Sequence, residues 1–469
     1  MKNEGDEDLA NRIFEGTGIE ITLTGERHLG AVIGSEEFRD KYVKNKVAKW
    51  VDDVEQLSTL AQNEPQLAYC AYTKALSMRW CFVQRTIPNI KQYFQPLEDA
   101  IREKFIPAVI GRRVNNIERM IFSLPVRLGG LGIQNPTETA DIEFKNSYTI
   151  TRNLTSLIES QEHDLTNYDV DQLKLDMKKM KTEKEEKMID KLEEIKTLVN
   201  EKMKRQLELL CEKGAGAMLS ALPLKSLDNV FNKQEFRDAI RMRYDWDVPD
   251  TPRYCACGAK FTTDHILICK KGGYVSMRHD NIRNFEASLL REVCKDVRIE
   301  PPLLPINAAE ISSTNQANRA RLDVSAVGVW GATERTFFDV RVMHMNSPSY
   351  LGKSPEQLYE QHEQEKKRQY NHRVIDVEKG SFSPLVYSTT GGMGPECTRF
   401  HKRLAELISL KRGESYADIM NFVRTRLRIS LLKSTLIAIR GERGKGRRSK
   451  ESLQDVSFNL IPEKDTYEV

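Results

Sequence analysis

Two short segments that are rich in regularly placed apolar residues, and that a turn joins, limit the fold of this chain more than any other feature. Residues 320–327 alternate between apolar and polar side chains, and residues 336–343 are rich in β-branched and aromatic side chains. Both patterns predict strands. The turn around residues 331–334 can join them as a hairpin, so we expect Asp323 and Asp339 to lie at one edge of a sheet.

The segments around this hairpin extend an α/β pattern. Residues 278–294 predict a helix upstream, residues 355–374 predict a charged helix downstream, and residues 384–388 predict a further strand. The predicted order is therefore αββαβ. Helical spacing places three side chains of the downstream helix on one face: Glu363, Lys366 and Tyr370.

The two aspartates suit a hard metal ion. Mg²⁺ prefers oxygen ligands, and phosphodiester cleavage also needs a cation near the attacking water. Asp323 and Asp339 would supply the oxygens, and Arg341 or Lys366 the cation. The alternative is that each of these charged side chains is simply a solvated surface group.

A second cluster precedes this region, with the spacing C-x-C-x7-H-x3-C. Three thiols and one imidazole suit a closed tetrahedral Zn²⁺ site, and a glycine after the second cysteine permits the tight turn that such a site needs. The predicted zinc ligands are Cys255, Cys257, His265 and Cys269. The alternative is a buried apolar cluster of cysteines. His279 is either a spare ligand or the opening of the next helix.

The order of these elements resembles the PD-(D/E)xK superfamily of restriction-like nucleases. Arg321-Leu-Asp323 stands in place of Pro-Asp, and Asp339-Val-Arg341 stands in place of D/E-x-K. The resemblance implies that Asp323 and Asp339 bind Mg²⁺ or Mn²⁺, and that the chain is a metal-dependent DNA endonuclease. It also implies that Lys366 replaces the missing strand lysine, as in members that take this lysine from the next helix.

Further roles follow from the same resemblance. Lys366 would stabilise the transition state, and Tyr370 would orient the helix or a backbone phosphate. Glu363 belongs to the same catalytic face. Glu286, on the first helix of the nuclease fold, would either assist through a water molecule or be a surface acid.

A zinc knuckle directly before a restriction-like endonuclease is similar to the carboxy-terminal region of non-LTR retrotransposon polyproteins. Residues 25–34 resemble the last palm strands of a reverse transcriptase, and the helices after them resemble its thumb. Residues 125–133 resemble the segment that closes the thumb region in such proteins, residues 221–223 resemble their linker motif, and residues 271–280 resemble the segment that joins knuckle to nuclease.

This second resemblance implies that the partners are a DNA target and the element RNA, and that the site of action is nuclear. The chain has no predicted strand hairpin that carries an aromatic-x-Asp-Asp sequence, so we expect no reverse transcriptase activity from it alone. It looks like a carboxy-terminal fragment, either a truncated copy or a separate gene model. The rival interpretations are a non-catalytic, zinc-stabilised nucleic-acid-binding protein and an inactive remnant.

Composition agrees with an intracellular protein of α/β multidomain architecture. A length of 469 residues allows two to four domains, and a net charge of +4 means that any basic surface must be local. Eight cysteines without a signal peptide argue against a disulfide framework. No apolar run is long enough to predict membrane insertion.

The predicted segments are 1–35 (palm end), 36–150 (thumb-like helices), 151–213 (charged helix or helical hairpin), 214–275 (linker and CCHC knuckle), 276–440 (endonuclease) and 441–469 (tail).

The charged segment carries apolar residues every three or four positions, which predicts a long amphipathic helix or helical hairpin. These residues are Leu173, Met177, Met180, Met188, Leu192, Ile195, Val199, Met203 and Leu207. They could mediate self-association, or they could pack on the neighbouring domain.

The end of the chain is basic and has too few apolar groups to fold. This composition favours phosphate contact or nuclear import, with a solvated tail as the alternative. The predicted nucleic-acid-binding residues are Arg440, Arg443, Lys445, Arg447, Arg448 and Lys450.

Overall fold

The computed structural model of the protein describes residues 5–161, 170–305 and 320–441. Its contacts divide the chain into two units, residues 1–199 and residues 200–469. The protein is mixed α/β, with many helices and a small sheet in the second unit. Within the described ranges, no helix combines the length and the hydropathy required to cross a lipid bilayer.

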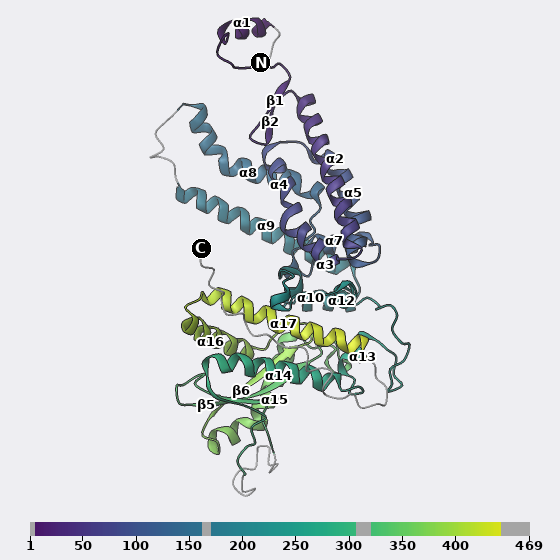
Figure 1. Cartoon of the computed structure of the whole chain (residues 1–469), viewed down its shortest axis with the longest axis vertical. Coiled ribbons are helices and arrows are strands. Elements are labelled where there is room, and N and C mark those ends of the chain that lie inside the picture. Colours follow the sequence, from purple (N-terminus) through teal and green to yellow (C-terminus); the bar gives the residue numbers. More distant parts are fainter. Residues whose placement is uncertain (1–4, 162–169, 306–319, 442–469) are drawn as a thin grey trace. The chain divides into compact units, whose positions relative to one another are not determined.

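The first unit is largely helical (Figure 1). Its strands are β1 (Gly25–His28) and β2 (Ala31–Gly34), which form an antiparallel hairpin. Its helices are α1 (Gly5–Ile13), α2 (Glu36–Ala61), α3 (Pro65–Ala71), α4 (Met78–Thr86), α5 (Gln95–Ala100), α6 (Ile106–Ile110), α7 (Asn116–Ser123), α8 (Pro136–Glu159) and α9 (Val170–Leu198). The helical character predicted for residues 36–150 is confirmed. Residues 25–34, which resembled a pair of strands, do form the β1–β2 hairpin, and α1 precedes it.

The long helix α2 shows why this unit folds as a bundle. The side chain of Ser35 caps it by accepting the amide hydrogen of Phe38. Its buried residues recur at helical spacing, as Val43, Val47, Trp50 and Val54 do. The ring of Trp50 stacks on Phe94 and meets Trp80 edge-on, each with 6.1 Å between centroids.

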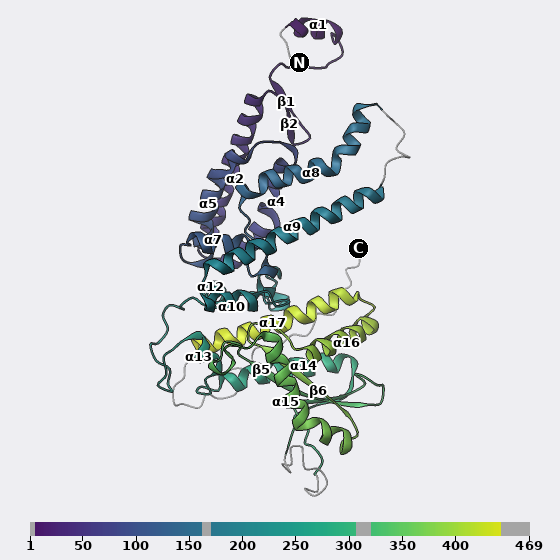
Figure 2. The ribbon, with the colours of Figure 1, turned by 180° about the vertical axis from the view of Figure 1, so that it is seen from behind.

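Helices α8 and α9 lie side by side (Figures 1 and 2). The predicted boundary between residues 150 and 151 falls inside α8. The regularly spaced apolar residues of the charged segment do not share one environment. Leu192 and Ile195 of α9 are buried, whereas Met177 is 51% exposed. The last of these residues, Met203 and Leu207, lie beyond residue 199, in the second unit.

The second unit holds both predicted sites. Its helices are α10 (Glu201–Leu210), α11 (Ala217–Ser220), α12 (Lys233–Arg243), α13 (Thr263–Ile268), α14 (Tyr274–Val293), α15 (Pro355–Asp376), α16 (Pro395–Arg412) and α17 (Tyr416–Arg440). Its strands are β3 (Lys295–Ile299), β4 (Val324–Val327), β5 (Arg335–Met343) and β6 (Ser381–Ser388).

The four strands form one sheet in the order β3-β4-β5-β6. Strands β3, β4 and β5 are antiparallel neighbours, and β6 runs parallel to β5 after the crossover through α15. The predicted hairpin is therefore confirmed. Asp323 lies one residue before β4, and its backbone N–H still donates to the carbonyl of Phe338 at 3.0 Å.

Both faces of this sheet are covered by helices (Figures 1 and 2). Phe338 and Val340 of β5 pack into the larger core with residues of α14, α16 and α17. The alternate residue Phe337 packs on the other face, against Tyr370 of α15. Because successive side chains of a strand point to opposite faces, Asp339 shares the face of Phe337 and α15.

The predicted order αββαβ is wrong by one strand, because β3 makes it αβββαβ. Strand β3 is a mostly exposed edge strand with an irregular register against β4. Its sequence, KDVRI, is largely charged, as is common at sheet edges. Only Val297 and Ile299 alternate with charged residues in this segment, and two apolar positions are too short a pattern for hydrophobic periodicity to indicate a strand.

Candidate functional site

The hairpin β4–β5 brings the two predicted aspartates together. The backbone N–H of Val340 donates to Oδ2 of Asp323 at 2.6 Å, so this carboxylate is folded back onto β5. Asp339, the residue before Val340, is only 6% exposed. Burial raises the pKa of Asp339, Lys366 opposes that rise, and the neighbouring Asp323 carboxylate adds to it.

Helix α15 supplies the cation of this cluster. The Nζ atom of Lys366 lies 2.8 Å from Oδ2 of Asp339. A capping box at Ser354 fixes the start of α15 and hence the turn on which Lys366 lies. The ammonium also lies 5.8 Å from the ring centroid of Tyr370. Three of the predicted residues, Asp323, Asp339 and Lys366, are thus grouped.

The fourth member of the cluster is His279, for which the sequence pattern indicated only other roles. Its Nε2 lies 3.3 Å from Oδ2 of Asp323 and 3.1 Å from the carbonyl oxygen of Val340. The contact with Asp323 raises the pKa of His279 to about 8, against the effect of burial and with help from Asp280. His279 is not a zinc ligand and does not open a helix, because α14 begins at Tyr274.

The other predicted residues lie elsewhere. Arg341 forms an ion pair with Glu365 at 3.1 Å. Tyr370 is a core residue that packs with Phe382, and its contact with the cluster runs through Lys366. Glu363 faces the start of α16, where its Oε1 accepts the backbone N–H of Glu396 at 3.0 Å.

The position of Glu363 gives a pH-dependent prediction. Burial raises its pKa to about 7. Because the folded pKa is above the unfolded one, the proton on Glu363 stabilises the fold at low pH, and this stability is lost as the pH rises through about 7. Glu363→Gln should therefore gain stability relative to wild type between about pH 5 and pH 8. Urea unfolding across this range measures it.

Glu360→Gln, an exposed acid on the same helix, is the control and should follow wild type. Parallel stability curves for Glu363→Gln and wild type would contradict the raised pKa.

Glu286 is neither a surface acid nor a member of the cluster. It is fully buried on α14, where Oε1 accepts the hydroxyl of Tyr387 at 2.7 Å and lies 3.0 Å from Nε2 of His401. The pKa of His401 is raised to about 10: burial alone would lower it, but the interactions with Glu286 and Cys397 together outweigh burial. This pair belongs to the core between α14 and α16.

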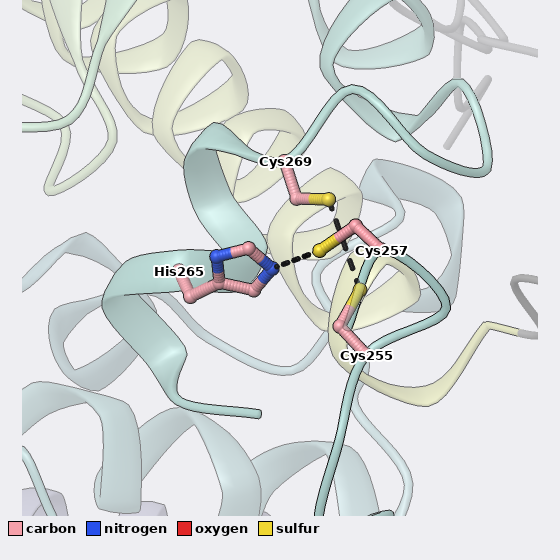
Figure 3. Close-up of side chains that lie close together, drawn as sticks. All are labelled: Cys255, Cys257, His265 and Cys269. Carbon is pink, nitrogen blue, oxygen red and sulfur yellow. Dashed lines mark hydrogen bonds between the residues drawn. The ribbon is translucent and has the colours of Figure 1, made fainter. Parts of the chain in front are cut away.

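The predicted zinc ligands meet at one point (Figure 3). Their four donor atoms lie within 4.8 Å of one another. The Sγ atoms of Cys255 and Cys269 are 3.7 Å apart, and Sγ of Cys257 lies 3.2 Å from Nε2 of His265. Two sulfurs of a tetrahedral site with bonds of about 2.3 Å would be about 3.8 Å apart. The cluster can therefore hold zinc.

Local structure explains how the chain builds this cluster. Gly258 has a φ of +90° and closes a tight turn, in which its N–H donates to the carbonyl of Cys255 at 2.8 Å. Thr262 caps α13, which carries His265 in its first turn. Cys269 follows the end of the same helix.

The Cys/His cluster is attached to the sheet by polar contacts. Asp264, next to His265, lies 2.8 Å from Nε2 of His344, the residue after β5. Nδ1 of that histidine is 2.9 Å from the hydroxyl of Thr389. Arg278 of α14 is buried and donates to the carbonyl of Leu267 in α13. The cluster and the sheet are therefore parts of one packed unit.

The basic end of the chain contributes one described residue. Arg440 ends α17, donates to Asp238 at 2.7 Å and also donates to the carbonyl of Pro249. It holds α17 to neighbouring segments, in contrast with its predicted role in a free basic tail. The other predicted nucleic-acid-binding residues lie outside the described residues: Arg443, Lys445, Arg447, Arg448 and Lys450.

Comparison of the sequence with models of protein families and with curated proteins found no match. The carboxylate cluster and the Cys/His cluster are therefore the two observations from which a function can be inferred.

Proposed function

We propose that this protein is a metal-dependent DNA endonuclease of the PD-(D/E)xK type that nicks one strand of its target. The observation that carries this proposal is the meeting of Asp323, Asp339 and Lys366 at one edge of the sheet. The order αβββαβ around them supports it, because the carboxylates come from adjacent strands and the lysine from the next helix.

The donor set fits Mg²⁺ or Mn²⁺. Both ions take oxygen ligands, and Mg²⁺ is commonly held by one or two carboxylates together with waters and substrate phosphates. Asp323 and Asp339 interact electrostatically, and this repulsion contributes to the raised pKa of Asp339. A divalent cation between two such carboxylates would relieve the repulsion. When bound, it would lower the pKa of a water molecule and so supply the nucleophile.

The side chains of the cluster have separate tasks in this proposal. Asp323 and Asp339 hold the metal. Lys366, already 2.8 Å from Asp339, places a positive charge where the attacked phosphate gains negative charge. Attack of the water oxygen on phosphorus would form a new P–O bond and break the bond to the 3′ oxygen, and the proton that the water loses would balance the one that the leaving oxygen gains.

The remaining parts extend the proposal. We infer a retrotransposon-derived chain whose helical first unit grips nucleic acid as a polymerase thumb does, and whose zinc-bearing segment helps to place the nuclease on DNA. Its partners would be the DNA target and the element RNA, in the nucleus, and it would not polymerise DNA by itself. Tyr148 of α8 and Met177 of α9 are exposed apolar residues that a second copy of the chain would cover. We therefore also propose self-association through these two helices.

A plasmid nicking assay tests the proposal. Purified zinc-loaded protein should convert supercoiled plasmid to the open-circular form with added Mg²⁺ or Mn²⁺. The metal-free control should omit these ions rather than include EDTA, because a chelator would also remove zinc. Retained DNA binding without nicking at either ion would reject the enzyme and favour the non-catalytic binding protein; loss of both would favour an inactive remnant.

A further inference from the structure

We propose that His279 is a positioning residue that holds the Asp323 carboxylate in place for metal binding. This inference rests on the proposed nuclease function. It assigns to α14 a direct part in the carboxylate cluster, in addition to its packing on the sheet.

The geometry around Nε2 supports this role. The atom faces two oxygens that come from different strands, 3.3 Å from Oδ2 of Asp323 and 3.1 Å from the carbonyl of Val340. One N–H therefore donates to both. Oδ2 of Asp323 also accepts the N–H of Val340 at 2.6 Å. Two donors on one oxygen fix the orientation of the carboxylate.

A series of polar contacts on the Nδ1 side of the ring also holds the imidazole in place. Nδ1 of His279 lies 3.4 Å from Asp280, whose carboxylate is 3.2 Å from Nη1 of Arg283. Arg283 pairs with the carboxylate of Glu300. The backbone N–H of Glu300 donates to the carbonyl of Asp323 at 2.9 Å. These contacts therefore end at Asp323, so that both its side chain and its main chain are held by hydrogen bonds.

The first turns of α14 are themselves anchored. Arg278 is 3% exposed and donates to the carbonyl of Leu267 at 3.0 Å. Asn281 donates to the hydroxyl of Ser434 in α17 at 3.1 Å. His279 lies between these two anchors, so the imidazole is presented from a fixed platform. Rigid support of this kind keeps a site within the narrow geometry that metal binding requires.

The physical consequence concerns the two carboxylates. Asp323 and Asp339 repel each other, and a free Asp323 side chain would rotate away. The N–H of His279 opposes this rotation. Hydrogen bonds to metal-binding groups commonly change metal affinity by roughly 10- to 100-fold when they are removed.

The test compares His279→Leu with His279→Gln, whose amide keeps an N–H donor. Mn²⁺ binding to zinc-loaded protein is measured by calorimetry, and thermal unfolding and zinc content are measured in parallel. We expect His279→Leu to bind Mn²⁺ roughly 10- to 100-fold more weakly, and His279→Gln to recover part of the loss. The matched control is His372→Leu, an exposed histidine of α15 paired with Asp376, which should bind as wild type does.

The outcomes separate the two proposals. Wild-type affinity in a folded His279→Leu protein would overturn the positioning role and leave the nuclease proposal standing. An equal loss in both His279 variants would also overturn it, because the donor would then be irrelevant. Absence of Mn²⁺ binding in wild type would reject the nuclease proposal and this inference with it.

Discussion

Asp339→Asn should abolish metal-dependent nicking, by roughly a thousandfold or more, which corresponds to about 4 kcal/mol of transition-state stabilisation. The amide keeps the shape of the side chain but removes the charge that would hold the cation. It also removes the ion-pair partner of Lys366, which lies 2.8 Å away. Rates of plasmid nicking with Mg²⁺ or Mn²⁺ measure the effect.

Asp376→Asn is the matched control, because this acid lies on α15, is about half exposed and pairs with His372. It should nick as wild type does. Unfolding in urea should show that Asp339→Asn remains folded. Unchanged nicking by Asp339→Asn would refute the assignment of the site to the β4–β5 hairpin.

Cys255→Ser should release zinc and loosen the part of the sheet that the Cys/His cluster contacts. Zinc at a thousandfold excess over its Kd contributes about 4 kcal/mol to the stability of the state that binds it. The contact between Asp264 and His344 connects the cluster to the end of β5. Hydrogen exchange of the full chain should therefore become up to roughly a thousandfold faster in α13 and near residue 344.

Cys294→Ser is the control, since this partly buried thiol lies in the same unit outside the cluster. It should keep its zinc and its slow exchange near residue 344. Loss of zinc in Cys255→Ser with unchanged exchange at the end of β5 would show that the cluster folds independently of the sheet. Wild-type zinc content in Cys255→Ser would remove this thiol from the ligand set.

Local pattern was enough to predict the β4–β5 hairpin, the charged helix α15 and the four Cys/His residues that meet. Each depends on neighbours close in the chain: alternation for the strands, a three- or four-residue spacing for the helix, and a compact motif for the thiols and imidazole. Glu363 shows what a local pattern leaves undetermined. Helical spacing placed it beside Lys366, but packing against α16 determined what it contacts.

Only the tertiary structure decided that His279 joins the site and that Glu363 does not. His279 is 44 residues from Asp323 in the chain, and Lys366 is 27 residues beyond Asp339. These contacts depend on how α14 and α15 pack on the sheet, which periodicity within each segment cannot specify. The sequence determined the types and local order of the elements around the site, except for β3, through short-range sterics and burial. The contacts between α14, α15 and β5 came from packing of segments far apart in the chain.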